Sequence, residues 1–280
     1  MTTFPGADAD RDAADYVVVG APLDATTTFR PGARFGPDRV RRFARPFDDY
    51  DRRTDADFSD RSVHDAGDVA PWDATDEYLD HLAAELRAAV FDGAVPVAVG
   101  GEHTVSWAGV RATDPDTFVV LDAHLDLRDA HGGNPLNHAC VTRRVLDGRD
   151  DRDGPTADRA VVLGARTGSR AEWDRAAAAD VTVVPPEDVA AWLADLDPAT
   201  LGDAYLSVDV DAADPAVAPG TGTMEPFGLD AADLRAAVRA VAPAAVGFDV
   251  VEVNDRDDGQ AAALGGKLLR EFVHAHAASA

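Results

Sequence analysis

The sequence predicts an α/β protein built on an open, mainly parallel sheet with helices on both faces. Two observations predict this fold class. Continuous apolar runs of β-type residues recur along the 280-residue chain, a pattern typical of strands buried on both faces of a parallel sheet. Amphipathic stretches lie between several of these runs, and such an alternation of strand and helix builds a doubly covered sheet.

Each expected element follows from its own pattern. The expected strands are YVVVG at 16–20, VPVAVG at 95–100, TFVVL at 117–121, AVVLG at 160–164, VTVV at 181–184, AYLSV at 204–208 and AVGFDVV at 245–251. The expected helices are the amphipathic stretches 76–93, 187–196, 229–242 and 259–277. No repeat or composition break marks a second domain, so residues 15–280 are expected to form one domain. Residues 1–14 are polar and expected to be frayed, and the acidic, turn-rich segment 146–159 is an expected surface loop.

The charge balance is strongly acidic. The chain has 51 Asp and Glu against 26 Lys and Arg, a net charge of −25, and Lys267 is its one lysine. This balance argues against nucleic acid and anionic membranes as partners and favours small cationic substrates. So many acids with abundant alanine resemble the proteins of salt-accumulating halophiles, in which salt screens surface repulsion. The alternative is a solvated acidic surface without functional meaning.

The sequence also indicates a cytoplasmic location. It contains no uncharged apolar stretch of 18 residues and no signal-like start, because its first residues are acidic and polar. Cys140 is the single cysteine and cannot form an internal disulfide, which agrees with a reducing compartment. We expect Cys140 to be a small buried residue rather than a thiol nucleophile.

Acids and histidines follow three of the expected strands at the point where each ends. DAHLDLRD follows strand 117–121, SVDVDAADP continues strand 204–208, and GGEHTVSW follows strand 95–100. In open α/β sheets, sites form outside the carboxyl ends of the strands, and residues two apart on an extended chain share a face. The three stretches therefore bring together six candidate metal ligands: His103, Asp122, His124, Asp126, Asp209 and Asp211.

This residue set points to a pair of metal ions. Acids at strand ends also cap helices, but four carboxylates and two imidazoles together can neutralise two divalent cations. Oxygen ligands with two nitrogens suit Mn²⁺ better than a thiolate-preferring metal, and a metal pair holds the hydroxide nucleophile of metal-assisted hydrolysis. The remaining histidines are expected on the surface or on helices: His64, His81, His131, His274 and His276.

Together these stretches resemble the ureohydrolase family of arginases and agmatinases, most of all an agmatinase of a halophilic archaeon. The matching stretches cover nearly the whole chain in the family order: 17–41, 100–107, 122–129, 137–144, 207–229 and 249–254. The resemblance implies a three-layer α/β/α arginase-like fold, two Mn²⁺ per subunit, and a homo-oligomer that is usually a trimer or hexamer.

The resemblance also implies how the six ligands divide between the metals. Each metal would have one histidine and one aspartate of its own, and two further carboxylates would bridge the pair. The separate ligands would be His103 with Asp126 and His124 with Asp211, and the bridging ones Asp122 and Asp209.

Catalytic roles follow from the same resemblance. The bridging hydroxide would attack the guanidinium carbon of the substrate, and Asp126 would pass its proton to the leaving amine. His138 would shuttle protons near the substrate, and Glu252 would pair with the guanidinium. Two positions depart from the common family pattern. Glu102 stands in GGEHT, where GGDHS is frequent, and Asp255 replaces a proline, which leaves the shape of the adjacent loop open but not the role of Glu252.

The substrate is expected to be agmatine, which would be cleaved to putrescine and urea. The segment LGARTGSRAEW at 163–173 lacks the acidic step of the arginase stretch GLRDVD, and the loop around GGNPLNHAC lacks the arginase-type Ser-Gly-Asn run. One alternative is a sister ureohydrolase acting on arginine, guanidinobutyrate or an agmatine conjugate. A second is a non-catalytic metal-binding relative with a regulatory or structural role.

Overall fold

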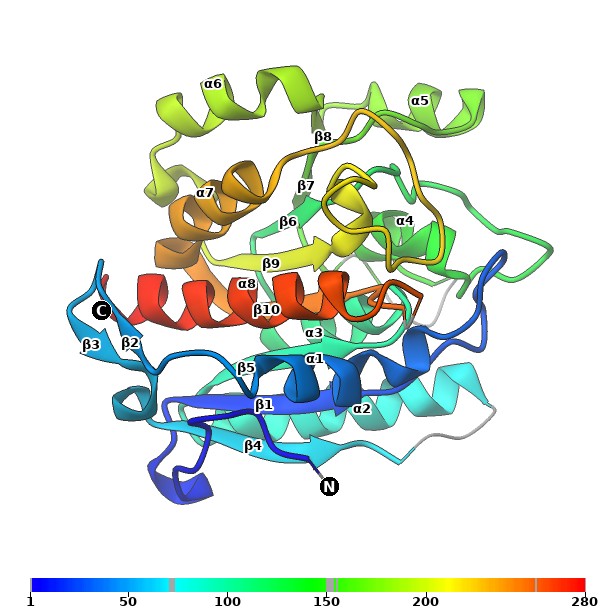
Figure 1. Cartoon of the computed structure of the whole chain (residues 1–280). Helices are drawn as coiled ribbons and strands as arrows, with labels where there is room; N and C mark the ends of the chain where they lie inside the picture. The colour runs from blue at the N-terminus through cyan, green and yellow to red at the C-terminus, as the bar shows by residue number, and fades with distance from the viewer. Residues whose placement is uncertain (1, 71–73, 150–153, 155, 255, 280) are drawn as a thin grey trace.

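The computed structural model describes residues 2–70, 74–149, 154, 156–254 and 256–279. Within these residues, an eight-stranded sheet has the order β4-β1-β5-β10-β9-β6-β7-β8, and its neighbouring strands are parallel (Figure 1). The strands are β1 (Tyr16–Ala21), β4 (Val63–Asp68), β5 (Val95–Gly100), β6 (Thr117–Leu121), β7 (Arg159–Leu163), β8 (Val181–Val184), β9 (Ala204–Asp209) and β10 (Ala245–Val251). A small hairpin of β2 (Tyr50–Asp51) and β3 (Ala56–Asp57) lies outside this sheet.

Helices cover both faces of the sheet, as expected. The helices are α1 (Gly36–Ala44), α2 (Thr75–Phe91), α3 (Val105–Thr113), α4 (Val141–Asp147), α5 (Arg170–Ala176), α6 (Val189–Asp195), α7 (Ala231–Val241) and α8 (Gln260–Ala277). The core on one face contains residues of α1, α6, α7 and α8, and the core on the other contains residues of α2, α3, α4 and α5 (Figure 1). The three-layer α/β/α prediction is therefore confirmed.

The apolar runs that predicted the strands are buried on both sides. In β5, Val97 and Val99 belong to one core and Ala98 belongs to the other, because successive side chains of a strand point to opposite faces. Burying one such valine contributes about 1.5–3 kcal/mol. The seven expected strands are present. The sequence pattern did not predict β4, a sheet-edge strand whose residues VHDAGD are only partly buried.

The N-terminal segment differs from its prediction. Instead of fraying, residues 2–14 pack on the domain: Phe4 is fully buried, and its ring centroid lies 5.7 Å from that of Phe58. The N–H of Phe4 donates to Asp65 at 2.6 Å. The segment is polar overall, and it is held by Phe58 and Asp65, which lie far away in the sequence. The periodicity of the segment itself does not reveal such contacts.

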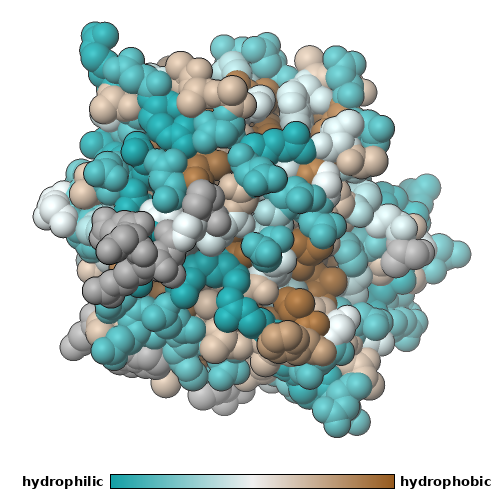
Figure 2. Space-filling view, turned by 180° about the vertical axis from the view of Figure 1, so that it is seen from behind, coloured by the Kyte–Doolittle hydropathy of each residue, from teal (hydrophilic) through white to brown (hydrophobic). Residues whose placement is uncertain are grey.

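One face of the molecule is largely hydrophilic. Seen from behind, teal side chains cover most of the molecule and a smaller apolar area lies among them (Figure 2). None of the helices in the described ranges is both long and apolar enough to span a membrane.

Of the expected acidic loop 146–159, positions 150–153 and 155 lie outside the described residues, as does Asp255.

The strand order decides where the site forms. Strands β5, β10, β9 and β6 are neighbours in the centre of the sheet. All four are parallel, so their carboxyl ends meet at one edge. The stretches that follow these four strands are those that carry the predicted site residues.

Candidate metal centre and active site

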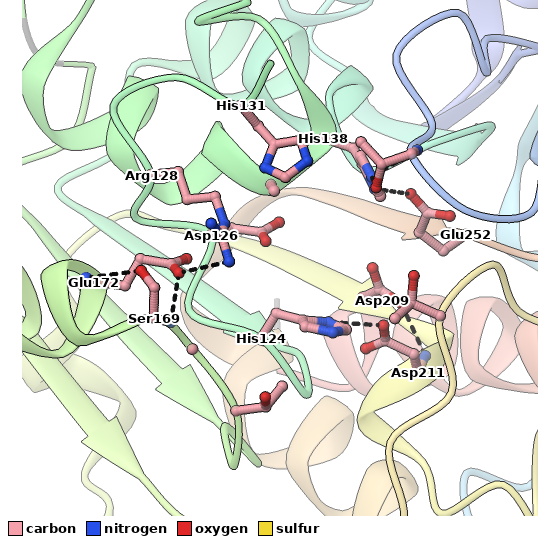
Figure 3. A pocket seen from close by; sticks show the side chains of 15 residues that line it. His124, Asp126, Arg128, His131, His138, Ser169, Glu172, Asp209, Asp211 and Glu252 are labelled. Atoms are coloured by element: carbon pink, nitrogen blue, oxygen red, sulfur yellow. Dashed lines mark hydrogen bonds and ion pairs between the residues drawn. The ribbon is translucent and has the colours of Figure 1, made fainter. Parts of the chain in front are cut away.

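A cavity of about 350 Å³ opens at this edge of the sheet. Figure 3 shows acids and histidines from several elements pointing into it. Six of the eight predicted site residues line the cavity: His124, Asp126, His138, Asp209, Asp211 and Glu252. The other two, His103 and Asp122, are each 1% exposed.

The first candidate metal group lies around His103. Its Nδ1 is 2.9 Å from Asp126 Oδ2, 3.2 Å from Asp122 Oδ2 and 3.6 Å from Asp209 Oδ2. His103, Asp122 and Asp209 offer ligand atoms within 4.8 Å of one another. A single cation could therefore contact this imidazole and these carboxylates.

The second candidate group lies around His124 and shares Asp122 with the first. Nδ1 of His124 is 3.0 Å from Asp211 Oδ2 and 3.4 Å from Asp122 Oδ1. Backbone N–H groups hold these acids in place, since Ala123 donates to Asp211 at 3.1 Å and the N–H of Asp211 donates to Asp209 at 2.8 Å. The sharing of Asp122 makes it a candidate bridge between two ions.

The donor set fits divalent cations. Four carboxylates are buried together, and Oδ2 of Asp122 makes no hydrogen bond among the described residues. This oxygen has only the 3.2 Å contact with Nδ1 of His103, and a buried carboxylate is costly unless a positive group compensates it. Oxygen ligands with two imidazole nitrogens match the preferences of Mn²⁺.

The pKa values of these acids are shifted because several carboxylates are buried close together. Burial, followed by repulsion from Asp122, raises the pKa of Asp126 to about 6. Burial and repulsion from Asp211 raise the pKa of Asp209 well above its ordinary value. The pKa of Asp122 moves the other way: burial raises it, but contacts with the two imidazoles outweigh that effect. Metal ions replace protons in such clusters.

Glu252 and His138 form a pair beside the candidate ligands. Their facing atoms, Oε1 and Nδ1, are 3.2 Å apart (Figure 3). Oε1 of Glu252 also accepts from the N–H of His103 at 3.0 Å. On the other edge of the imidazole, the Thr28 hydroxyl lies 2.9 Å from Nε2. The ring is therefore held from both sides at the cavity wall.

Glu102 has a role that the sequence did not predict. It is fully buried, and it accepts from the N–H of Thr26 at 2.9 Å, from the Thr26 hydroxyl at 2.7 Å and from the Thr27 hydroxyl at 3.1 Å. Thr26 Oγ1 in turn accepts from the N–H of His138 at 3.0 Å. Glu102 thus anchors the loop that holds His138.

Further cavity residues were not predicted from the sequence. Arg128, Ser169 and Glu172 line the cavity together with the predicted residues (Figure 3). Arg128 lies two residues after the D-x-H-x-D pattern and Glu172 lies in the 163–173 segment, so their positions in the chain were the available signal. His131 also lines the cavity rather than lying on the outer surface.

Three histidines lie apart from the site: His274 and His276 are on α8, as expected, whereas His64 is in the edge strand β4 and not on a helix. His64, His274 and His276 hydrogen-bond to Ala9, Thr54 and Tyr16 respectively. Cys140 is fully buried, and burial, followed by repulsion from Asp126, raises the pKa of its thiol to about 11. So high a pKa leaves little of the reactive thiolate near neutral pH.

Comparison with known proteins places the chain among ureohydrolases. The model of the arginase family matches residues 14–275. An agmatinase of Pyrococcus horikoshii is 33% identical over 262 residues, 91% of this chain and 90% of that protein. An N(1)-aminopropylagmatine ureohydrolase of Thermococcus kodakarensis is 34% identical, covering 91% and 88%. The crystal structure of agmatine ureohydrolase of Thermoplasma volcanium superposes with a TM-score of 0.90 at 32% identity, covering 99% and 94%.

Proposed function

The chain belongs to the arginase family, and from that premise we propose that it hydrolyses the guanidinium group of agmatine, giving putrescine and urea. It is an agmatinase-like ureohydrolase, similar to agmatinases over nine-tenths of its length. The observation that carries the proposal is the position of Glu252. Its carboxylate lines the same cavity as the candidate ligands Asp126, Asp209 and Asp211, so a guanidinium paired with it would lie beside them.

The proposed cofactor is a pair of Mn²⁺ ions per subunit. One would be held by His103 and Asp126, the other by His124 and Asp211, with Asp122 and Asp209 shared. When bound, two such cations supply Lewis-acid chemistry and lower the pKa of a water molecule to near neutrality.

The residues of the chain would bind the substrate and transfer the protons. Glu252 would pair with the two N–H groups of the guanidinium and fix its plane, as carboxylates do in fork-shaped ion pairs. Asp126 would accept a proton and deliver it to the leaving nitrogen, as a carboxylate acting in general acid–base catalysis does. His138 lies 3.2 Å from Glu252 and would carry protons between the cavity and solvent.

A second candidate substrate is an agmatine conjugate. The support for it is the relative named N(1)-aminopropylagmatine ureohydrolase, which is as similar to this chain as the agmatinases are. Arginine and guanidinobutyrate would require a distal carboxylate to be accommodated in the same cavity.

The test is urea release from agmatine, aminopropylagmatine, arginine and guanidinobutyrate in parallel, with added Mn²⁺. We expect agmatine to have the highest kcat/KM and its turnover to be lost in Asp126→Asn. A higher kcat/KM for another guanidine would overturn the substrate assignment and keep the site. No urea from any of them, despite bound manganese, would support a non-catalytic relative.

Three further properties are proposed on the strength of the sequence. We expect a trimeric or hexameric assembly, as in the ureohydrolases that the chain resembles, and light scattering would give its mass. The excess of 51 acids over 26 bases supports operation at high salt in a halophilic cell. A cytoplasmic location remains a prediction.

A further inference from the structure

A buried aspartate that the proposed mechanism does not use lies behind the candidate metal ligands. Asp249 on β10 is fully buried, and it is the register partner of Ser207 on β9. Its Oδ1 accepts from the Ser207 hydroxyl at 2.6 Å, and its Oδ2 accepts from the Tyr205 hydroxyl at 2.9 Å. Neither donor carries a charge, and burying a carboxylate is costly unless a positive group compensates it.

Ser207 connects Asp249 to His103. The Oγ of Ser207 lies 3.3 Å from Nε2 of His103 and 3.2 Å from the hydroxyl of Ser106. A hydroxyl has one proton to donate, and an ionised carboxylate can only accept. Ser207 therefore donates its proton to Asp249, and Nε2 of His103 carries the proton of the 3.3 Å contact. In a neutral imidazole this leaves Nδ1 without a proton, as a metal ligand requires.

The other nitrogen of this imidazole faces the candidate metal ligands. Nδ1 of His103 is 2.9 Å from Asp126 and 3.2 Å from Asp122, so the hydrogen bond at Nε2 leaves free the nitrogen that a cation would contact. Burial raises the pKa of Asp249, whereas its bond with Ser207 and the charge of His103 act against this rise. A cation bound at His103 would therefore stabilise the ionised form of Asp249.

We propose that Asp249 is a positioning residue, which acts through Ser207 to hold His103 in its metal-binding form and so strengthens one of the two metal sites. We call Asp249, Ser207 and His103 the Asp249 relay. The inference rests on the proposed metal pair and is independent of which guanidine is the substrate. A carboxylate that accepts from the outer nitrogen of a metal-binding imidazole, here through a hydroxyl, fixes the ring and makes it a stronger ligand.

The histidine of the second candidate metal group has a different environment. Nε2 of His124 lies 4.0 Å from Oε1 of Glu225, which is too long for a hydrogen bond. Both of these side chains are partly exposed, 25% and 32%, so solvent reaches this pair, whereas the relay is buried. Loss of Asp249 should therefore affect the His103 site and spare the His124 site.

The experiment measures Mn²⁺ binding to the metal-free protein by titration calorimetry, with no guanidine present. Asp249→Asn removes the charge and keeps the size of the side chain, and Ser207→Ala breaks the link to His103. We expect each variant to weaken one Mn²⁺ site about 10- to 100-fold and to change the other by less than about twofold. Equal weakening of both sites, or of neither, would overturn the proposal.

A double-mutant cycle identifies the site that is weakened. In a His103→Asn background, Asp249→Asn should cause little further loss of Mn²⁺ affinity, because the relay has no imidazole left to hold. In a His124→Asn background, the loss caused by Asp249→Asn should persist. The opposite pattern would show that Asp249 does not act through His103.

Tyr205→Phe separates positioning from folding. It removes the other hydroxyl that donates to Asp249 but leaves the link between Ser207 and His103 in place. We expect it to lower the urea midpoint of the metal-free protein, as Asp249→Asn should, while Mn²⁺ affinity stays within about twofold of the wild type. If Tyr205→Phe weakens Mn²⁺ binding as much as Asp249→Asn does, the effect is one of packing and the relay does not exist.

Failure of the proposed metal pair would give a different result. A wild type that binds no Mn²⁺ would overturn the metal pair and the relay together. A wild type that binds two Mn²⁺ with the same affinities as Asp249→Asn and Ser207→Ala would overturn the relay and keep the metal pair.

Discussion

Asp126 and Glu252 share an uncommon backbone conformation. Their φ angles are 49° and 62°, in the left-handed region that costs a residue with a side chain about 1–3 kcal/mol. Surrounding bonds hold both: the carbonyl of Asp126 accepts from Arg143 at 3.0 Å, and the N–H of Glu252 donates to Gly101 at 2.8 Å. Such strain is characteristic of functional sites, and here it occurs at two acids with proposed catalytic roles.

The pKa of His138 gives a prediction at the residue scale. Burial lowers this pKa, but the contact with Glu252 outweighs burial and raises it from 6.5 to about 9. The pair therefore stabilises the folded state fully below pH 6.5 and stops doing so as the pH rises through about 9. An NMR titration of the metal-free protein should find the raised pKa, and Glu252→Gln should lower it by about one unit or more.

An exposed pair supplies the control for this titration. Glu85 lies 3.8 Å from His81 on the surface of α2, so Glu85→Gln should leave the pKa of His138 unchanged. A pKa of His138 that does not respond to Glu252→Gln would contradict the pairing.

Metal binding gives a second prediction at this scale. Asp122 belongs to both candidate groups, whereas Asp211 belongs to one. Asp122→Asn should therefore weaken both Mn²⁺ sites and Asp211→Asn mainly one, as measured by calorimetry and metal content. Equal loss of both metals in the two variants would argue against the shared position of Asp122.

Metal removal should also lower stability. A cation that binds the native state at a hundred times its Kd adds about 2.7 kcal/mol to the free energy of unfolding for one site. Urea denaturation with manganese and with a chelator should show this difference in the wild type, and a much smaller one in Asp122→Asn.

At the scale of elements, the turn after β5 holds the site together. The N–H of Gly101 donates to Ala21 at 2.8 Å, and its carbonyl accepts from Glu252. A Cβ at Gly101 would lie 2.0 Å from the carbonyl oxygen of Leu23, which is backbone and cannot move aside. The close contact of β1, β5 and β10 at this turn therefore requires glycine.

Gly101→Ala should destabilise the protein by about 1–3 kcal/mol, as overpacking does. Gly154→Ala is the matched control, because none of the residues that the structure describes comes within 4 Å of a Cβ at Gly154. Urea denaturation measures both. Equal stability of Gly101→Ala and wild type would show that the turn can shift, and the site would then not depend on this contact.

At the scale of the whole molecule, the net negative charge should make the stability of the fold depend on salt. A net charge of −25 produces self-repulsion, which acts over about 10 Å at 0.1 M salt and about 3 Å at 1 M. Raising KCl from 0.1 M to 2 M should therefore raise Tm, with most of the rise below 1 M, where screening changes most. Thermal unfolding followed by circular dichroism measures it.

The control for general solute effects is a neutral osmolyte at matched osmolality. It should raise Tm less than KCl does, because it leaves the charges unscreened. A Tm that is independent of KCl would show that the acidic surface is tolerated without salt, contrary to the halophilic interpretation.

The sequence by itself determined the layered fold and the six candidate ligands. Continuous apolar runs predict buried parallel strands wherever they occur, and alternation after a strand places side chains such as Asp122 and Asp126 at its carboxyl end. Both patterns involve residues that are neighbours in the sequence, so they can be recognised in the sequence alone. The resemblance to the family added His138 and Glu252.

Only the tertiary structure decided which strand ends meet and what else lines the cavity. Strand β10, the last along the chain, lies between β5 and β9, and this order brings Glu252 beside His103. Thr28, Arg128 and Glu172 reach the cavity from three separate segments, and the polar residues 2–14 dock through Phe4. Each of these depends on contacts between residues far apart in sequence, which local periodicity does not encode.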